Sequence, residues 1–511
     1  MPSLRKRTVL LSLSALLENV GALATAIVLS WLLAKDVYGT YRQTFFVYRL
    51  LLGVLGLNIA LSLLYFIPRA KREEHPAYVG QSVLLALGVG AVIGLIIAVG
   101  ADFIGWATNN PKLVPLLYLM VPYAVLNQIT RIMPNTLLSV DRPGLVLAHD
   151  AVAMIGRNTC IIVPFVLGVE VYWVIATVLA WEFLLAGGGM ILVQMVIGIR
   201  FRGLDTSRLL EQLSYTWPLL ATSIIATLNI QFDRAVIAAA FDSERFADYT
   251  NGAMKIPFVI IAVRALHRAL LPEMARLARD GQIQPMMGLF RTGAVKGALV
   301  VFPVVVFFLL CPDYVVTLVY GDKYLLSSVP FAIYCAGLVI RVATYTSVFQ
   351  AMGKNRLTVI GAVTAFAANA AVSLLLVFLG KHYYGPDSVL AFAGPAVGTV
   401  ISTYLCNIVF IFLIARVTDC PVLKVLPLGA LGKTMGAALA GAAAAVLFRW
   451  TPLPNLAKVA CMAVTFSVIF LALTRRAGLI SPRDVEFALG PVKRVLRGVA
   501  NRLGRPKPPQ S

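Results

Sequence analysis

The sequence predicts an all-α polytopic membrane protein, from its composition, its long apolar segments and the positions of its charges. Of its 511 residues, 59% are hydrophobic and 13% are charged, whereas soluble globular chains are about 45–50% apolar and about 25% charged. This composition excludes an ordinary soluble enzyme, a disordered regulator and a fibrous protein. Neither half of the chain is polar enough to form a soluble domain, which also excludes a receptor with a single span.

The apolar segments predict the number of spans, because a helix needs about 20 apolar residues to cross a bilayer and polar breaks mark its ends. The first segment is longer than the roughly 7–15-residue apolar core of a signal peptide, so we expect it to remain as a span. We expect fourteen spans: Thr8–Ala34, Tyr38–Phe66, Ala77–Ile104, Leu113–Val140, Pro143–Gly168, Val171–Ile199, Leu209–Phe241, Phe246–Pro272, Gly288–Tyr320, Leu326–Met352, Leu357–Gly380, Val389–Ala415, Val425–Phe448 and Leu456–Thr474.

The charges predict the orientation, because cytoplasmic loops carry an excess of arginine and lysine. With the N-terminus inside, the predicted outer loops hold only Lys35, Lys112, Arg245, Lys323, Lys381 and Arg449. The tail after Thr474 is basic as well. The predicted inner segments before it are richer than the outer loops and hold Arg5, Lys6, Arg7, Arg69, Lys71, Arg72, Arg142, Arg200, Arg202, Arg208, Arg276, Arg279, Lys354, Arg356, Arg416 and Lys424. We therefore expect both termini in the cytoplasm.

Local motifs recur after a little over 200 residues. Tyr38-Gly39-Thr40-Tyr41 opens the second predicted span and Phe246-Ala247-Asp248-Tyr249 opens the eighth. Because six spans restore the starting side of the membrane, we expect two parallel six-helix repeats that form a V. The expected division is an N-terminal lobe over 1–199, a linker over 200–208, a C-terminal lobe over 209–424, two additional spans over 425–474 and a basic cytoplasmic tail over 475–511.

Arginines inside the predicted spans are the candidate binding residues. A charge at mid-bilayer costs at least about 2.5–3.5 kcal/mol on insertion scales, and a guanidinium group binds phosphate through two parallel hydrogen bonds. The deep acids Glu18, Glu182 and Asp233 are too few to neutralise every arginine, although a purely structural role in ion pairs stays open. We predict a cationic cavity for a phosphate or pyrophosphate, lined by Arg42, Arg49, Arg131, Arg157, Arg264, Arg268 and Arg341.

Other patterns carry less chemistry. Glu18, near the middle of the first span, is the candidate for ion coupling, with Asp233 as a second candidate that is more simply explained by a local pair with Arg234. The cysteines and histidines lack metal-ligand spacing, and no nucleophile lies in a recognisable arrangement with a base. We expect no enzyme activity, cofactor, metal or nucleic-acid partner. The basic tail fits an amphipathic helix on the inner leaflet or a disordered segment.

Several motifs resemble the polysaccharide-biosynthesis branch of the multidrug/oligosaccharidyl-lipid/polysaccharide (MOP) exporter superfamily, over roughly residues 8–480. Besides the two six-span halves, the resemblance rests on Val37-Tyr38-Gly39-Thr40-Tyr41, Gln231-Phe232-Asp233-Arg234, Gly353-Lys354-Asn355-Arg356, Asn369 and Gly394-Pro-Ala-Val-Gly-Thr-Val-Ile-Ser402. The order and spacing of these motifs make the match more specific than any one of them.

The resemblance implies a flippase for the synthesis of exopolysaccharide, capsule or O-antigen. Such a protein moves undecaprenyl-pyrophosphate-linked oligosaccharide across the cell inner membrane by alternating access, with membrane lipids and a polysaccharide polymerase as further partners. Two alternatives stay open. A cation-coupled multidrug antiporter of the same superfamily predicts an acidic cavity, and a non-transporting membrane scaffold predicts a partner bound by the basic tail.

Overall fold

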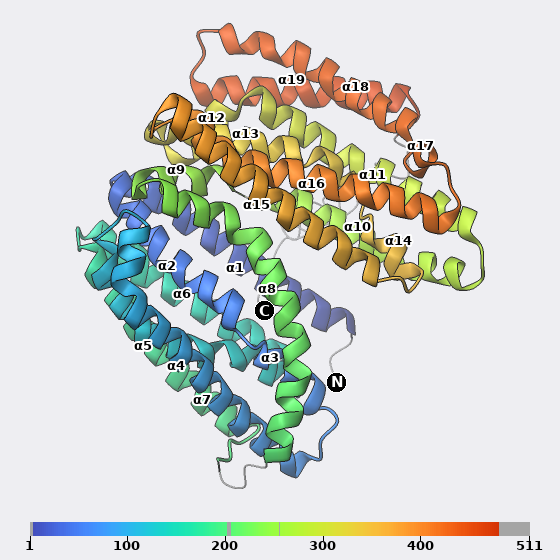
Figure 1. The fold of residues 1–511 in the computed structure, drawn as a ribbon. Helices are drawn as coiled ribbons and strands as arrows, with labels where there is room; N and C mark the ends of the chain where they lie inside the picture. The colour runs from blue at the N-terminus through green and yellow to red at the C-terminus, as the bar shows by residue number, and fades with distance from the viewer. Residues whose placement is uncertain (1–3, 202–205, 255, 480–511) are drawn as a thin grey trace, which may run out of the picture. The chain divides into compact units, whose positions relative to one another are not determined.

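The computed structural model describes residues 4–201, 206–254 and 256–479, and the regular elements over these ranges are helices (Figure 1). The chain divides into two compact units. Unit 1 comprises Met1–Met254, Val316–Ile333 and Ala362–Ser402, and unit 2 comprises Lys255–Val315, Tyr334–Gly361 and Thr403–Ser511. Each unit is described by itself.

Unit 1 is built mainly from the first half of the chain. Its elements are α1 (Leu4–Leu32), α2 (Lys35–Leu55), α3 (Ile59–Phe66), η1 (Arg72–Glu74), α4 (His75–Ala107), α5 (Leu113–Ser139), α6 (Pro143–Val166), α7 (Val171–Val196), α8 (Thr206–Ala240), α9 (Ser243–Gly252) and η2 (Asp322–Ser327). In Figure 1, α4, α5 and α7 run side by side, and α5 contacts both of the others.

Unit 2 is built from the second half of the chain. Its elements are α10 (Pro257–Arg279), α11 (Ile283–Leu310), η3 (Val339–Val342), α14 (Thr346–Ala351), α17 (Val422–Val425), α18 (Leu428–Ala445), η4 (Val446–Trp450) and α19 (Asn455–Arg476). Four helices contribute residues to both units: α12 (Pro312–Tyr320), α13 (Ser328–Gly337), α15 (Arg356–Tyr384) and α16 (Val389–Thr418).

The prediction of an all-α polytopic membrane protein is confirmed. Ten helices among the described residues are long and apolar enough to cross a membrane, or eleven if α2 and α3, which meet at a bend of 46°, count as one span. In their described parts, the segments expected as the seventh, eighth and tenth spans contain no helix that is both long and apolar enough to be among these candidates. The last two expected spans, in contrast, correspond to the clear candidates Leu428–Trp450 and Asn455–Arg476.

Some expected spans are broken rather than continuous. The segment expected over Tyr38–Phe66 is interrupted between α2 and α3, where Asn58 takes the left-handed conformation with φ 50°. The segment expected over Phe246–Pro272 is interrupted between α9 and α10, and the one over Leu326–Met352 is divided among η2, α13, η3 and α14. Apolar length alone does not reveal such breaks, because a broken helix remains compatible with a membrane where neighbouring helices satisfy its backbone groups.

Small residues allow the helices of unit 1 to approach closely, as is common in membrane bundles. In α4, an added Cβ at Gly90 would lie 2.7 Å from Cα of Val125 in α5. In α2, an added Cβ at Gly39 would lie 1.9 Å from the carbonyl oxygen of Ser243 in α9. The first turns of α2 and α9, which carry the two repeated motifs, therefore pack backbone to backbone.

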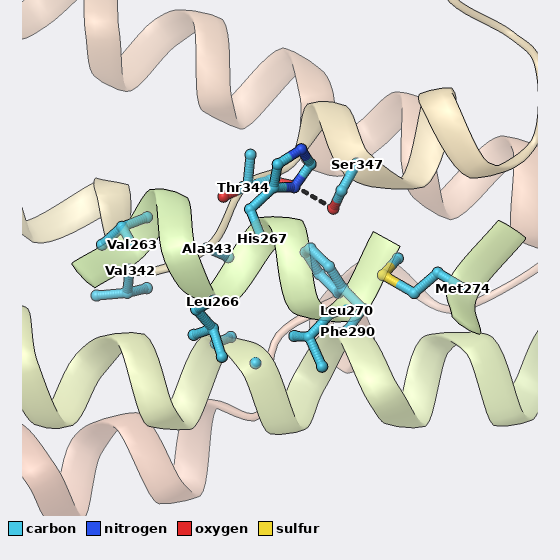
Figure 2. Close-up of a pocket in the computed structure, with 12 residues that line it drawn as sticks. Val263, Leu266, His267, Leu270, Met274, Phe290, Val342, Ala343, Thr344 and Ser347 are labelled. Carbon is cyan, nitrogen blue, oxygen red and sulfur yellow. Dashed lines mark hydrogen bonds between the residues drawn. The ribbon is translucent and has the colours of Figure 1, made fainter. Parts of the chain in front are cut away.

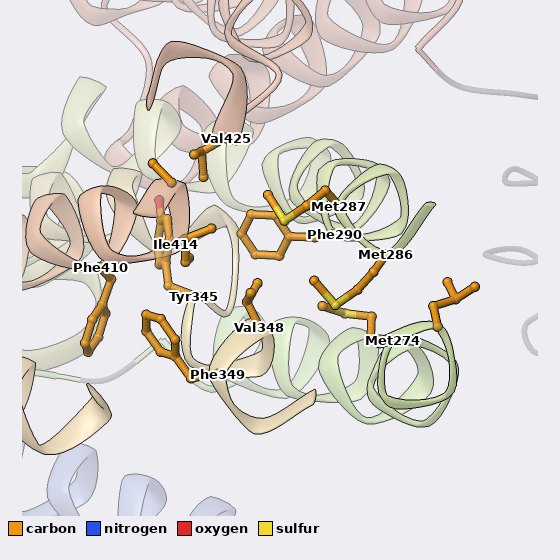
Figure 3. Packing of buried hydrophobic residues seen from close by; sticks show 12 residues of the cluster. Met274, Met286, Met287, Phe290, Tyr345, Val348, Phe349, Phe410, Ile414 and Val425 are labelled. Carbon is orange, nitrogen blue, oxygen red and sulfur yellow. The ribbon is translucent and has the colours of Figure 1, made fainter. Parts of the chain in front are cut away.

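Unit 2 has an apolar core in which long, flexible side chains fill the space between helices. Met274 of α10 and Met286, Met287 and Phe290 of α11 lie with Tyr345 and with apolar residues of α14 and α16 (Figure 3). Methionine fills irregular gaps well because it is unbranched and polarisable. The adjacent helices α18 and α19 contact each other and α11.

We predict that Gly39→Ala destabilises the protein, because its methyl group would collide with the backbone of α9. Overpacking costs typically 1–3 kcal/mol, which should lower the thermal unfolding midpoint of the detergent-solubilised protein. Gly187→Ala in α7 is the matched control, since no atom lies within 4 Å of its added Cβ. Equal loss of stability in both variants would contradict the close α2–α9 contact.

Candidate substrate-binding site

The candidate site in unit 1 begins on α2, where aromatic residues recur at helical spacing. Tyr41 meets Phe45 edge-on with ring centroids 5.2 Å apart, and Tyr41 also meets Phe165 of α6 at 6.0 Å. Tyr123 of α5 lies against both Phe45 and Tyr48, with centroids 5.9 and 5.2 Å away. These edge-to-face contacts, each worth about 0.5–1.5 kcal/mol beyond burial, hold α2 against α5 and α6.

Arg42 is held in place by neutral groups. Its guanidinium donates to the Tyr38 hydroxyl at 2.8 Å and to the carbonyl oxygen of Thr250 at 3.4 Å, and it lies 5.4 Å from the centroid of the Tyr38 ring. None of these groups carries a negative charge, so the positive charge of Arg42 is oriented but not neutralised.

Arg49 lies two turns further along α2 and is exposed. Its Nε donates to the carbonyl oxygen of Phe45 at 3.2 Å. Arg42, together with Arg234 of α8, is close enough to Arg49 for their positive charges to repel, and Tyr41 and Tyr123 are close to it as well. Neighbouring positive charges repel one another, and an anion that binds between them removes this repulsion.

Arg131 and Arg157 extend the same basic region onto α5 and α6. Both arginines are electrostatic neighbours of Tyr48 and Tyr123, the two rings that join α2 to α5. Arg131 is exposed, and Arg157 is 36% exposed. The structure therefore brings four of the predicted site residues, Arg42, Arg49, Arg131 and Arg157, into one unit around a shared set of tyrosines.

A buried carboxylate positions Arg157. Glu182 of α7 is fully buried and accepts hydrogen bonds from Asn127 at 2.7 Å, from Thr130 at 2.5 Å and from Arg157 at 3.2 Å. The Tyr48 hydroxyl donates to the side-chain oxygen of Asn127 at 2.8 Å and so links this network to α2. From the sequence, Glu182 was expected only to neutralise an arginine. An acid within an apolar segment does not show which distant side chains it contacts.

The balance of charges still favours the cations. Arg157 forms an ion pair with Glu182, whereas Arg42, Arg49 and Arg131 have no carboxylate partner among the described residues. Asp233 is buried and accepts from the backbone N–H of Arg234 at 2.9 Å and from the Tyr249 hydroxyl at 3.4 Å. Glu18, the other coupling candidate, is exposed on α1, whereas Asp233 is buried in α8.

The remaining predicted site residues lie on helices of unit 2. Arg264 is in α10, and its side chain lies outside the described part of the structure. Arg268 of α10 and Arg341 of η3 are both exposed. The cavity that α10 and α11 form with Val342, Thr344 and Ser347 around His267 has a volume of about 20 Å³ (Figure 2), which is room for about one water and not for a phosphate-linked sugar.

Polar contacts join the start of α2 to α9 and η2 within unit 1. Lys35 and the buried Asp248 form an ion pair at 2.8 Å, Ser327 also contacts Asp248 at 3.3 Å, and the Tyr38 hydroxyl donates to Asn251 at 2.9 Å. Burial and the nearby charge of Lys35 lower the pKa of Lys323, which donates to the carbonyl oxygen of Leu33 at 2.6 Å. Lys35, which was expected in an outer loop, is the first residue of α2.

The arrangement is suited to binding rather than to catalysis. Guanidinium forks and tyrosine hydroxyls together bind phosphate oxygens and sugar hydroxyls. The described residues contain no group of histidine, cysteine or acidic side chains that could hold a metal ion.

The chain matches the model of a known protein family. The model described as "Polysaccharide biosynthesis protein" matches residues 24–329, which is more than half of the sequence. No curated protein matches the sequence significantly.

Solved structures of MOP-superfamily transporters share the fold. The lipid II flippase MurJ in an inward closed conformation is 12% identical with a TM-score of 0.69, over 92% of this chain and 99% of that chain. An inward-facing multidrug resistance MATE-family transporter is 13% identical with a TM-score of 0.61, over 81% and 99%. A MOP transporter from Pyrococcus furiosus, whose binding pocket is described as having reverse polarity, is 12% identical with a TM-score of 0.51, over 81% and 95%.

We predict that Glu182→Leu strongly destabilises the protein, because Asn127, Thr130 and Arg157 would all lose their shared acceptor. Removing one partner of a buried ion pair costs about 3–5 kcal/mol. Glu182→Gln keeps one acceptor oxygen and should cost less. Thermal unfolding of the purified variants measures both effects, and a Leu variant as stable as the Gln variant would mean that the network does not position Arg157.

Proposed function

The chain belongs to the polysaccharide biosynthesis protein family, and we propose on this premise that it flips a polyprenyl-pyrophosphate-linked oligosaccharide across the cell inner membrane. Its product would serve the synthesis of exopolysaccharide, capsule or O-antigen, with a polysaccharide polymerase as the next partner. The MOP-type fold and the many apolar helices support a multi-pass transporter.

One observation carries the proposal. Arg42, Arg49 and Arg131 lie in predicted membrane-spanning segments and have no carboxylate partner among the described residues. Each such charge is costly in hydrocarbon. An anionic headgroup that binds between them offsets the cost, and the surrounding tyrosines offer hydroxyls and ring faces to the attached sugar. Arg264, Arg268 and Arg341 are the candidate residues of the second half.

The proposed mechanism is alternating access by two six-helix lobes, 1–199 and 209–424, with both termini in the cytoplasm. A repeat is supported by the starts of α2 and α9, because Lys35 and Ser243 are separated by the same offset as the two repeated motifs. Both helices are followed by a break, but α9 is shorter than α2, so the breaks lie at different points of the two halves. The oligosaccharide would occupy a central cavity between the lobes while the polyprenyl tail stays in lipid. Two further spans, 425–474, and the basic tail, 475–511, complete this topology.

The membrane potential favours the proposed direction. An inside-negative potential drives a negative charge outward, and this movement releases about 2.3 kcal/mol per charge per 100 mV. The export of a pyrophosphate therefore releases electrical free energy, and coupling through Glu18 or Asp233 is not required by the energetics.

A cation-coupled multidrug antiporter of the same superfamily is the alternative from the same fold. It needs acidic groups for cationic drugs, whereas the described residues of the candidate site present arginines around one buried, already paired acid. A scaffold that acts through the basic tail would not need charges inside its helices.

We predict that Arg49→Ala and Arg131→Ala each reduce flipping roughly ten-fold or more, the equivalent of one lost charge-assisted hydrogen bond of about 1.5–3 kcal/mol. Arg264→Ala tests the second half in the same way. The measurement is transfer of a lipid-linked oligosaccharide across vesicles that contain the purified protein. Arg475→Ala, at the end of α19, is the matched control. A folded Arg49→Ala/Arg131→Ala double variant with wild-type flipping would overturn the proposal.

We further predict that the Lys35–Asp248 pair closes the outer end of unit 1. Lys35→Ala should expose Thr250, which is 5% exposed, so that a cysteine introduced there reacts faster with a membrane-impermeant maleimide added outside. The assay uses a variant without native cysteines. The reversed pair Lys35→Asp/Asp248→Lys should restore slow labelling, and unchanged labelling in Lys35→Ala would contradict a closing role.

A further inference from the structure

Unit 1 contains an apolar groove at a different place from the arginine site. It has a volume of about 600 Å³ and lies between the α2–α3 break, α4 and the first turn of α8. Leu55 and Leu57 border it at the break, Leu84, Gly88 and Val92 along α4, and Leu209 on α8. Its volume falls within the roughly 300–1,000 Å³ of ordinary ligand pockets, but its walls offer few polar groups.

One face of α4 shapes the groove. Residues 81, 84, 85, 88, 89 and 92 line it, the spacing of a single helical stripe. Gly88 leaves a gap in the middle of this stripe, because no atom lies within 4 Å of a Cβ built there. Leu84 and Val92 are 40% and 50% exposed, so this apolar wall is open to whatever surrounds the helix.

Basic and aromatic residues lie at one end of the groove, and we call Tyr65, Arg69, Tyr78, Arg200 and Arg208 the collar. Arg208 of α8 lies 5.6 Å from the ring centroid of Tyr78 and pairs with Glu74 at 2.8 Å. Tyr78 is one helical turn before Gln81, and Arg208 is next to Leu209, so the collar adjoins the groove lining. An added Cβ at Gly80 would lie 2.1 Å from the carbonyl oxygen of Arg200, which places Arg200 beside the same turn of α4.

Tyr65 of α3 and Arg69, which follows this helix, lie near the same end of the groove. Arg69 lies 3.9 Å from the ring centroid of Tyr65, and Tyr65 stacks on Tyr215 of α8 at 4.6 Å. In the predicted orientation these residues lie at the cytoplasmic surface. Tyrosines and arginines at that depth are typical of the headgroup region, whereas the groove extends from there into the hydrocarbon.

Buried polar groups nearby are already satisfied by one another. Gln212 donates to Ser62 at 2.6 Å and to Ser82 at 2.7 Å, and Gln81 donates to Gln212 at 3.1 Å. This network ties α3, α4 and α8 together beneath the collar. The groove therefore offers an apolar channel and not a polar binding site.

We propose that the groove binds one acyl chain of an anionic phospholipid from the cytoplasmic leaflet, with the lipid phosphate at Arg69, Arg200 and Arg208. The length of the groove supports this occupant. From residue 81 to residue 92, α4 rises about 16 Å at 1.5 Å per residue, which is close to half of the ~30 Å hydrocarbon core. An acyl chain ends at that depth, whereas a long polyprenyl chain extends beyond it.

The site has a structural consequence for the transporter. The lipid chain would lie against Leu55 and Leu57, at the bend that separates α2 from α3. Leu55 is about 9 Å along the helix axis from Arg49, at 1.5 Å per residue. A lipid in the groove would thus support the end of the helix that carries the arginine site, without being the substrate.

The test is native mass spectrometry of the purified protein titrated with phosphatidylglycerol, phosphatidylcholine or undecaprenyl phosphate. The wild-type protein should retain phosphatidylglycerol at least five-fold more than phosphatidylcholine. Gly88→Phe fills the groove and should abolish this retention, whereas Gly187→Phe on the open face of α7 should preserve it. Arg69→Gln should reduce the preference for the anionic lipid while leaving phosphatidylcholine binding unchanged.

Each contrary result is informative. Equal retention of phosphatidylglycerol by Gly88→Phe and wild type, with both folded by size exclusion and thermal unfolding, would overturn the site. Loss of only undecaprenyl phosphate in Gly88→Phe would assign the groove to a polyprenyl chain instead of a phospholipid. If Gly88→Phe does not fold, Val92→Trp narrows the same groove, and unaltered retention in that variant would also overturn the proposal.

Discussion

The structure of unit 1 depends on one constraint, which is that each positive charge inside an apolar helix bundle needs a partner that compensates for the loss of water. Arg157 meets it with a buried carboxylate, Glu182, which three side chains hold in place. Arg42 meets it with a tyrosine hydroxyl and a backbone carbonyl. Arg49 and Arg131 are exposed and have no carboxylate partner among the described residues. The side chains of this region are thus held in place, but its positive charges outnumber its negative charges. An excess of positive charge is expected of an anion-binding surface.

Aromatic packing makes this arrangement possible. Phe45 and Tyr48 of α2 meet Tyr123 of α5 edge-on, and Tyr41 meets Phe45 in the same way. Rings have few rotatable bonds, so they fix the helices at a low cost in conformational entropy. The hydroxyls of Tyr38 and Tyr48 also take part in the hydrogen bonds that orient Arg42 and Asn127. The same residues thus hold the helices together and prepare the polar groups between them.

Helix α2 connects the features that matter for transport. Its first turns pack on α9 through Gly39 and the Lys35–Asp248 pair, its middle carries the arginines, and its end forms the break that borders the apolar groove. A bent helix can change its angle at the break without losing the packing of its first half. The ion pair at one end of α2 and a lipid at the other end would both influence the angle of this helix. In this way a local contact can change the conformation of the protein.

The sequence by itself determined the class, the family and the cationic character of the protein. Apolar length and loop charges reflect the bilayer whatever the helices contact, so α1, α4 to α7, α15, α16 and the pair α18 and α19 follow the predicted spans closely. The span expected over Gly288–Tyr320 is instead divided between α11 and α12. The breaks after α2 and α9, the pairing of Lys35 with Asp248 and the role of Glu182 were decided only by the tertiary structure. Hydropathy averages over a segment, whereas a break or an ion pair depends on which single side chain, far away in the sequence, lies opposite.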